Sequence, residues 1–253
     1  MTTALPLTTS DGVGLIAWHD PGPAELCFVL AHGFTGAGGS ASIRAVAARL
    51  TGSGGVLALD LRGHGLSDGE STLGDLEIHD VAAGVAAARE LGYAKVATIG
   101  FSMGASVVVR HDGTVGADVD AVISVSGPAF WHYRGTPAMR WVHRTIGTRV
   151  GRGFARIARG TRIAADGWQP APEPPDVVAP RIAPVPFLIV HGDQDGYFPL
   201  EHAHRLQLAA GTAELWIEAD MGHAEAAATP ALVARIAAWA RGAVGVGESR
   251  TTG

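Results

Sequence analysis

The sequence predicts an α/β fold, with helices on both faces of a mostly parallel sheet. One observation is that short apolar runs rich in β-branched residues alternate with longer, Ala-rich stretches of helical period. Another is that these runs are too apolar to expose one face to water, as expected of strands covered by helices on both sides. The length of 253 residues suits a single domain of this class, and 47% hydrophobic residues supply a large core, which excludes global disorder.

The predicted strands are the short apolar runs, because β-branched side chains favour the extended backbone of a buried sheet. In chain order they are Val13–Trp18, Cys27–Ala31, Val56–Asp60, Val96–Gly100, Ala121–Ser126, Phe187–Val190 and Glu214–Glu218. The predicted helices are the Ala-rich stretches between them, because Ala has the highest helix propensity. In chain order they are Ser40–Leu50, Glu77–Leu91, Met103–His111, Leu200–Ala210 and Pro230–Arg241.

The alternation of strands and helices breaks off once, which predicts an insertion. The chain therefore divides into a core formed by residues 1–127 and 185–242, a cap over residues 128–184, and a flexible tail over residues 243–253. Within the insertion, Gln169–Pro186 holds seven of the fourteen prolines, so we expect an extended, largely polyproline connector there.

Charge and cysteine content exclude several classes of protein. The net charge of −5, with a pI near 6.1, argues against nucleic acid as a partner. The single cysteine, Cys27, cannot close an intramolecular disulfide, which argues against a disulfide-stabilised secreted scaffold. The N-terminal residues have no signal-peptide pattern, and no apolar run reaches the roughly 18 residues of a membrane-spanning helix. We therefore expect a soluble, cytoplasmic protein.

The motif Gly-x-Ser-x-Gly, which can hold a nucleophilic serine on a sharp strand-to-helix turn, occurs twice. The first copy is Gly65-Leu-Ser67-Asp-Gly69, which lies in a polar, glycine-rich loop with no strand before it and no helix after it. The second is Gly100-Phe-Ser102-Met-Gly104, which follows a predicted strand and leads into a predicted helix. Context therefore favours Ser102 as the nucleophile and Ser67 as a loop residue.

A serine hydroxyl is a weak nucleophile at neutral pH, so Ser102 needs a base and an orienting carboxylate. Active sites of open parallel sheets lie beyond the carboxyl ends of the strands. Asp193 and Asp195 follow one predicted strand, and His223 follows the last one. The order serine, acid, histidine is that of one known hydrolase architecture, and the residues alone leave both carboxylates open as the acid.

Two backbone amides are candidates for stabilising the oxyanion of an acyl-transfer reaction. One belongs to Met103, directly after the nucleophile, and the other to Phe34, in the loop after an early strand where Gly33 allows close approach. His202 and His204 lie two residues apart on a predicted helix and point in different directions, which argues against a metal pair. We expect no metal and no cofactor.

Five segments together resemble the α/β-hydrolase-fold serine hydrolases. They are His32-Gly33-Phe34-Thr35-Gly36, Asp60-Leu-Arg-Gly-His64-Gly-Leu-Ser67, Gly100-Phe-Ser102-Met-Gly104, His191-Gly-Asp-Gln-Asp195-Gly-Tyr-Phe-Pro199 and Gly222-His223. They occur in the family's order, so the resemblance covers nearly the whole chain outside the insertion. It implies an α/β-hydrolase fold with an eight-stranded, mostly parallel sheet, and an insertion that covers the nucleophile as a short helical cap.

The resemblance also implies a role for three side chains, with Ser102 as nucleophile, Asp195 as acid and His223 as base. Similar sequences carry the acid in a Gly-x-x-Asp pattern, which selects Asp195 and leaves Asp193 as a turn residue. Serine in the motif argues against the family's haloalkane dehalogenases and epoxide hydrolases. Without a His-Gly-Gly-Gly run, the chain departs from the hormone-sensitive-lipase-like branch, which leaves the esterase, thioesterase and monoacylglycerol-lipase-like branches.

The predicted cap is basic and amphipathic. From Arg134 to Arg162 there are eight arginines and no acidic residue. Apolar residues recur at spacings of three and four over Met139–Ile157, which indicates a helix with one apolar face, although Gly147, Gly151 and Gly153 weaken it. An ordinary cap helix with a solvated face explains this pattern. The alternatives are a contact surface for anionic lipid headgroups, or a binding site for an acidic carrier protein or for the phosphates of coenzyme A.

We expect a serine esterase that cleaves a carboxylic ester with a small or medium apolar acyl group through an acyl-enzyme. The candidates for lining its substrate pocket are the aromatic residues Phe34, Phe101, Phe130, Trp131, Trp141 and Phe198. One alternative is a thioesterase that acts on acyl-CoA or acyl-carrier substrates. Another is a non-catalytic, ligand-binding protein of the same fold, since fold alone does not determine function.

Overall fold

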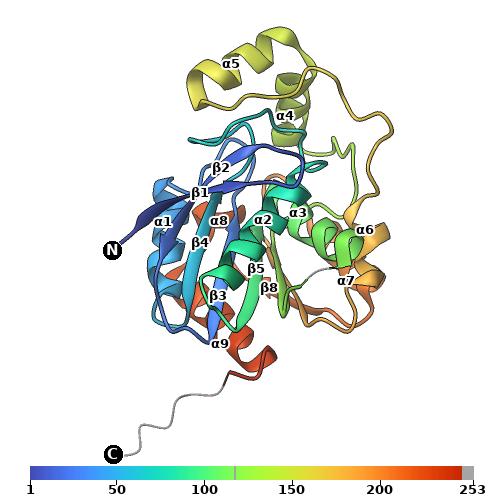
Figure 1. The fold of residues 1–253 in the computed structure, drawn as a ribbon. Coiled ribbons are helices and arrows are strands. Elements are labelled where there is room, and N and C mark those ends of the chain that lie inside the picture. Colours follow the sequence, from blue (N-terminus) through green and yellow to red (C-terminus); the bar gives the residue numbers. More distant parts are fainter. Residues whose placement is uncertain (117, 247–253) are drawn as a thin grey trace, which may run out of the picture.

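The central element is an eight-stranded sheet, as the computed structural model shows for residues 1–116 and 118–246 (Figure 1). The strands lie in the order β1-β2-β4-β3-β5-β6-β7-β8, and β2 is antiparallel to both of its neighbours while all other pairs are parallel. The strands are β1 (Thr3–Thr8), β2 (Gly14–Asp20), β3 (Leu26–Ala31), β4 (Gly55–Asp60), β5 (Lys95–Phe101), β6 (Ala121–Val125), β7 (Phe187–Gly192) and β8 (Glu214–Glu218). The predicted fold class is confirmed.

The seven strands predicted from the sequence are all present, with ends that differ by two residues or fewer. Strand β1 is not among them. It alternates exposed and half-buried residues, contains Pro6, and pairs only with β2 at the edge of the sheet. An edge strand of this kind has no continuous apolar run, so the criterion that identifies the buried strands does not detect it.

Five helices pack on the two faces of the sheet, and all five were predicted. They are α1 (Ala41–Leu50), α2 (Glu77–Glu90), α3 (Met103–His111), α7 (Leu200–Ala210) and α9 (Pro230–Ala243). Outside the insertion, the π-helical turn η1 (Asp112–Gly116) and the single turn α8 (Ala224–Ala227) were not predicted. Helices α1 and α9 lie on one face, and α2, α3 and α7 lie on the other (Figure 1).

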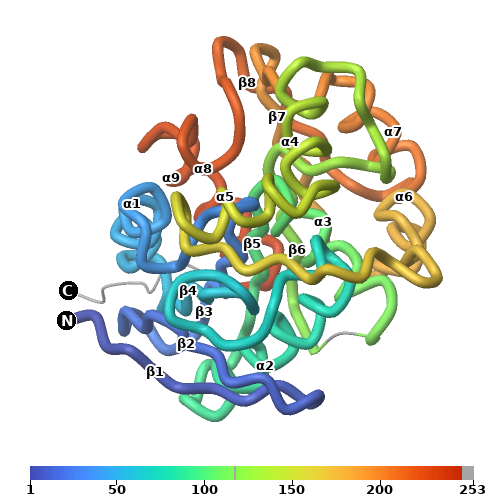
Figure 2. Tube along the Cα trace, turned by 90° about the horizontal axis from the view of Figure 1, so that it is seen from above, coloured from blue at the N-terminus to red at the C-terminus, as the bar shows by residue number. Residues whose placement is uncertain are grey.

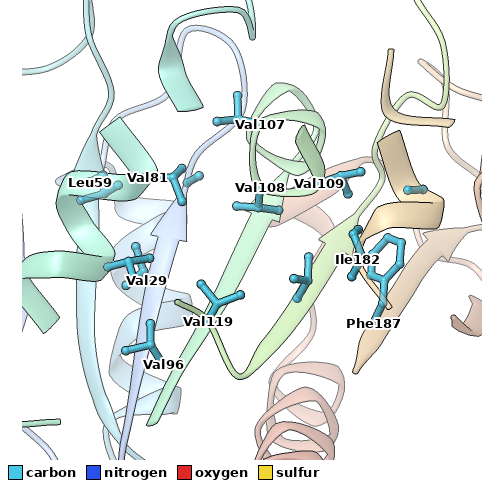
Figure 3. Packing of buried hydrophobic residues seen from close by; sticks show 14 of the residues in the cluster. Val29, Leu59, Val81, Val96, Val107, Val108, Val109, Val119, Ile182 and Phe187 are labelled. Atoms are coloured by element: carbon cyan, nitrogen blue, oxygen red, sulfur yellow. The ribbon is translucent and has the colours of Figure 1, made fainter. Parts of the chain in front are cut away.

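Each face of the sheet has its own hydrophobic core. On one face, Phe28 and Ile99 of the strands pack with Ile43 of α1 and Ile236 of α9. The other face is rich in valine, and Figure 3 shows residues of β3, β4 and β5 against side chains of α2 and α3. Burial on both faces explains why these strands are continuously apolar, and the carboxyl ends of the parallel strands β3–β8 lie at one edge of the sheet.

The cap between β6 and β7 consists of two helices, whereas the spacing of apolar residues over 139–157 predicted one. They are α4 (Pro137–Gly147) and α5 (Arg149–Arg159). Thr148 separates them with an extended backbone, and its hydroxyl accepts a hydrogen bond from the N–H of Gly151 at 3.0 Å. This N-cap starts a new helix at the point where Gly147 weakens the first one. Figure 1 shows both helices above the sheet.

The proline-rich connector is only partly extended. It contains the short helix α6 (Pro175–Val178) and the 3-10 turn η2 (Ala179–Arg181), in which proline occupies a first-turn position and so needs no N–H partner. Asp176 of α6 forms an ion pair with Arg205 of α7 at 2.6 Å. The end of the connector therefore packs against the core rather than against α4 and α5.

Helix α9 continues to Ala243, one residue into the segment predicted as a tail. Residues 247–253 of that predicted tail lie outside the described residues. Over residues 1–116 and 118–246, no helix has the length and apolar character needed to cross a membrane.

Candidate active site

Ser102 lies at the sharp turn between β5 and α3. Its backbone has a φ of 52° and a ψ of −112°, a strained conformation for a residue with a side chain. The glycines of the motif make the turn possible. A Cβ atom on Gly100 would collide with the backbone of Gly104, and one on Gly104 would collide with the carbonyl of Ala31. The turn therefore holds a half-buried Ser102 at the carboxyl end of β5.

Three side chains that are distant in the sequence form one chain of hydrogen bonds. The Nε2 atom of His223 lies 2.8 Å from the Oγ atom of Ser102, and its Nδ1 atom lies 2.8 Å from Oδ2 of Asp195. With the imidazole proton on Nδ1, that nitrogen donates to the carboxylate and Nε2 can accept the proton of the hydroxyl. This arrangement can deprotonate a serine hydroxyl and stabilise the resulting imidazolium ion.

The Asp195 carboxylate is fully buried but remains ionised. Burial alone would raise its pKa, but the hydrogen bond and charge of His223 and the backbone N–H groups of Phe198 and Tyr197 together lower the pKa below its usual value. Asp193, the other predicted candidate, instead accepts a hydrogen bond from the N–H of Asp220 at 2.8 Å. Of the two carboxylates, only that of Asp195 contacts the imidazole.

The loop that carries His223 is held by neighbouring backbone. Gly192 ends β7, where a Cβ atom would collide with the carbonyl of Met221. Ala224 has a positive φ of 56°, and its N–H donates to the hydroxyl of Ser126 at 3.0 Å. The close approach of Gly192 to Met221 and the hydrogen bond of Ala224 both lie within two residues of His223. They therefore hold the backbone of His223 in place near the carboxyl ends of β6 and β7.

Two aromatic rings after β7 contact the imidazole of His223. The ring of Tyr197 stacks on it, with centroids 4.2 Å apart and an interplanar angle of 25°. The ring of Phe198 lies 5.8 Å away and is almost fully buried. Phe198 was a predicted pocket residue, but Tyr197 was not. The segment Gly196-Tyr-Phe-Pro199 directly follows Asp195 in the sequence, and this closeness was the signal that could have identified Tyr197.

The loop after β3 passes beside Ser102. A Cβ atom on Gly33 would lie 3.3 Å from the Cβ of Ser102, so a side chain there would be tightly packed against Ser102, and Phe34 is the next residue. Met103 is the first residue of α3, and N–H groups in the first turn of a helix have no partner within that helix. The structure thus brings the segments with both predicted oxyanion donors to Ser102.

His32 fastens this loop to the core. Its Nδ1 atom donates to the carbonyl of Gly33 at 2.8 Å, and its Nε2 atom accepts from the N–H of Leu61 at 3.2 Å. Burial, with a smaller effect of nearby His64, lowers the pKa of His32 to about 3, so the imidazole is neutral. A neutral imidazole with both nitrogens engaged acts as a structural clamp.

Glu225 is a charged residue near Ser102 that the sequence does not single out. One oxygen of its carboxylate accepts a hydrogen bond from the N–H of Gly33 at 3.4 Å. Both oxygens lie 3.4 Å from the point where a Cβ of Gly33 would stand. The contact links residues far apart in the sequence, so only the folded chain reveals it.

The predicted aromatic pocket is not assembled as expected. Phe101 is 1% exposed and packs in the core beside α1 and α9, because the residue before Ser102 still belongs to the buried strand. Trp131 donates from Nε1 to the carbonyl of Pro172 at 2.7 Å and so ties down the connector. Trp141 on α4 is 57% exposed. Phe130 stacks on His202, with ring centroids 4.4 Å apart.

A cleft lies between the core and the end of α5. Its walls include Thr35 and Gly36, which directly follow Phe34, together with Leu66 of the core and Ala158 and Arg159 of the cap. Of the predicted pocket residues, none lines this cleft. Among the described residues, no group of three or more His, Cys, Asp or Glu side chains could hold a metal ion.

Ser67, in the other copy of the motif, has a different environment. Its hydroxyl donates to the carbonyl of Asp60 and accepts from the N–H of Ile16, and the residue is 2% exposed. The loop around it also anchors the cap. Arg162 donates to the carbonyls of Ser67 and Gly69, and Ser71 forms an isolated β-bridge with Ile163.

Comparison with known proteins agrees with the architecture. The family model described as the alpha/beta hydrolase family matches residues 28–236. The chain is similar to the solved structure of esterase Pf2001 from Pyrococcus furiosus, with 22% identity, a TM-score of 0.72 and coverage of 94% of this chain and 91% of that one.

Two further structures are similar at lower identity. They are the esterase RhEst1 from a Rhodococcus species (20% identity, TM-score 0.71, 96% of this chain and 98% of that one) and the α/β hydrolase GrgF from a Penicillium species (17%, 0.74, 97% and 99%). At these identities the similarity shows the fold. No protein of curated function matches the sequence significantly.

Proposed function

The chain belongs to the alpha/beta hydrolase family, and from this we propose that it is a serine esterase in which Ser102, Asp195 and His223 form the catalytic triad. The observation that carries the proposal is the continuous chain of hydrogen bonds from the hydroxyl through the imidazole to the buried carboxylate. Nucleophile, base and orienting acid are thus in contact, as acyl transfer by a serine requires.

In the first half of the proposed reaction, Ser102 Oγ attacks the ester carbonyl while its proton passes to Nε2 of His223. The carbonyl oxygen becomes an oxyanion, for which the amides of Phe34 and Met103 are the proposed donors. When the tetrahedral intermediate collapses, the bond to the alkoxy group breaks and the imidazolium gives its proton to the leaving alcohol. The products of this half are the alcohol and an acyl-enzyme.

In the second half, water replaces the alcohol. His223 removes a proton from the water as it attacks the acyl-enzyme, and then returns that proton to Oγ of Ser102 as the carboxylic acid leaves. Asp195 keeps its negative charge throughout, in agreement with its lowered pKa. Its charge holds the proton on Nδ1 and stabilises the imidazolium ion in both halves.

We propose a carboxylic ester with a small or medium apolar acyl group as substrate. The rings next to His223 support an apolar partner, since Phe198 and Tyr197 border the imidazole. A thioesterase is the second candidate, and the observation that favours it is the arginine-rich cap, which suits the phosphates of coenzyme A or an acidic carrier protein.

A fluorophosphonate probe tests the chemistry of the site directly. We expect it to label the purified protein at Ser102, and the variant Ser102→Ala to remain unlabelled. Absence of labelling in a correctly folded sample would instead support a non-catalytic, ligand-binding protein of this fold. A series of nitrophenyl esters of increasing chain length, run beside the matching acyl-CoA thioesters, then distinguishes esterase from thioesterase.

A further inference from the structure

Helix α5 presents an apolar row to solvent. Val150, Phe154 and Ile157 are spaced by four and three residues, which puts them on one face of the helix. Their exposed fractions are 85%, 55% and 89%. The apolar face of a cap helix normally packs against the core, but here the buried residue of the helix is Ala155. The apolar row is therefore free to contact something outside the chain.

The segment that carries this row is strongly basic. The eight arginines of residues 134–162 contribute +8 to a net charge of −5, so the rest of the chain carries −13. Within the described parts of the chain, no ion pair involves any of the eight. At 100° per residue, Arg152, Arg156 and Arg159 lie on the side of α5 opposite the apolar row.

Helix α5 lies on the outer side of the cap (Figure 1). The helix packs against α4, and Figure 1 shows it as the outermost element above the sheet. Viewed from above, α5 crosses in front of the sheet (Figure 2). The three side chains of the row are largely exposed, and none of them lines the cleft between the core and the end of α5.

We propose that α5 docks the protein on an anionic lipid surface, with Val150, Phe154 and Ile157 inserted at the boundary of headgroups and acyl chains. A helix with an apolar row and an arginine-rich polar side is the form that lies in a lipid interface. The eight arginines of residues 134–162 give the cap the positive charge that attracts it to anionic headgroups. Docking of this kind requires no catalysis and is separate from the proposed esterase activity.

The charge of the cap favours lipid over the other possible occupants of the row. A second copy of the chain would bring two segments that each carry eight arginines and no acidic residue close together, which is repulsive. Three exposed apolar side chains also fall short of the apolar centre that a stable dimer interface needs. An acidic protein would engage the arginines but leaves the exposed row without a function. An anionic lipid surface satisfies both features at once.

Co-sedimentation of the full chain with lipid vesicles tests this proposal. We expect binding to vesicles of phosphatidylcholine mixed with phosphatidylserine, and much weaker binding to phosphatidylcholine alone. The double variant Phe154→Asp/Ile157→Asp should weaken binding by about tenfold or more, because it removes the inserted side chains. The matched control is Leu208→Asp on α7, since Leu208 is also 85% exposed but lies outside the cap, and its binding should equal that of the parent.

The arginines are tested by Arg152→Gln/Arg156→Gln. This variant should weaken binding to anionic vesicles only, and added salt should weaken the parent in the same way because salt screens the attraction. In a Phe154→Trp variant, the indole emission should shift to shorter wavelength when anionic vesicles are added. All these positions are exposed or half-exposed, and unchanged circular dichroism shows that the variants fold.

Three results would overturn the proposal. The first is no binding of the parent to anionic vesicles. The second is vesicle binding that the arginine variant weakens but Phe154→Asp/Ile157→Asp does not, which would assign the cap to an acidic partner surface. The third is a dimer in sedimentation equilibrium that the same apolar variant dissociates, which would make the row an interface between copies. Labelling of Ser102 by a fluorophosphonate is read independently, so failure of docking and failure of the proposed esterase are distinguishable.

Discussion

Two segments of the molecule share the pattern Gly-x-Ser-x-Gly and differ in nearly everything else. Ser102 stands on a strained turn with its hydroxyl against the imidazole of His223. Ser67 stands in a loop with its hydroxyl hydrogen-bonded to the backbone of Asp60 and Ile16. The hydroxyl of Ser102 is hydrogen-bonded to an imidazole, which can accept a proton. The hydroxyl of Ser67 is hydrogen-bonded only to backbone groups, which hold it in place.

The difference lies in the elements on either side of each motif rather than in the five residues themselves. A strand that leads directly into a helix forces the backbone at Ser102 to reverse sharply, which projects the side chain beyond the sheet. The loop after β4 leads into no helix at Ser67, and the buried hydroxyl of Ser67 accepts a hydrogen bond from the half-buried N–H of Ile16. Removing the two hydroxyls should therefore affect different properties, one activity and the other stability.

The largest effect is expected for Ser102→Ala. If Ser102 is the nucleophile, this change should lower kcat by about 10⁵-fold to 10⁶-fold, since the remaining groups cannot form an acyl-enzyme. His223→Ala should cost a similar factor, because nucleophile and base act as a unit. Ester hydrolysis under single-turnover conditions measures both. A variant that retained parental kcat at either position would remove the basis of the proposed triad.

The next largest effect is expected at Asp195, the proposed acid. Asp195→Asn should lower kcat by about 10⁴-fold, because the neutral amide no longer holds the imidazole in the reactive tautomer. Asp193→Asn is the matched control, since Asp193 lies two residues away and bonds to the backbone of Asp220. It should keep kcat within a few-fold of the parent. The reverse ranking in steady-state kinetics would transfer the role of the acid to Asp193.

The glycines of the two motifs offer a smaller contrast. A Cβ on Gly104 would meet backbone carbonyls of Ala31 and His32, which cannot move aside, so Gly104→Ala should lower the free energy of unfolding by about 3 kcal/mol or more. Gly69 has a φ of +71° but its nearest contact is the side chain of Val13 at 3.2 Å. Gly69→Ala should cost only about 1–2 kcal/mol, from backbone strain. Urea unfolding that ranked the two variants equally would contradict this.

The smallest effect on activity is expected for Ser67→Ala. The change removes the partner of the half-buried N–H of Ile16 and leaves a small gap at a buried side chain, which should lower the free energy of unfolding by about 1 kcal/mol. Turnover at a temperature where the variant is folded should stay close to that of the parent. Thermal unfolding and kcat measured on one sample separate the two quantities. A severe drop in kcat with unchanged stability would mean that Ser67 takes part in the chemistry.

Most of the fold could be predicted because its strands are buried on both faces and therefore apolar throughout. The edge strand β1 and the single turn α8 lack such a signature, since their stability comes from one neighbour or from a few local bonds. The division of the cap into α4 and α5 depends on the N-cap at Thr148, a contact that the periodicity of apolar residues does not report.

The candidate site shows the same limit. Ser102 and His223 could be predicted as site residues because each follows a predicted strand. The residues alone did not distinguish Asp193 from Asp195 as the acid, and only the resemblance to the family favoured Asp195. Contacts such as Glu225 with Gly33 and the stacking of Tyr197 on His223 arise only when distant loops meet. Phe101 was misplaced because the residue before Ser102 still belongs to the buried strand β5, and its side chain packs in the core.

The loop around Ser67 has one more consequence, which follows from its bonds to Arg162 and from the bridge between Ser71 and Ile163. Through these bonds, residues 63–71 attach the C-terminal end of the cap helices to the core. An engineer who grafts a cap from another hydrolase onto this scaffold would therefore have to transplant that loop as well. In a chimera that exchanged only the segment between β6 and β7, the new cap would lack the bonds to residues 63–71.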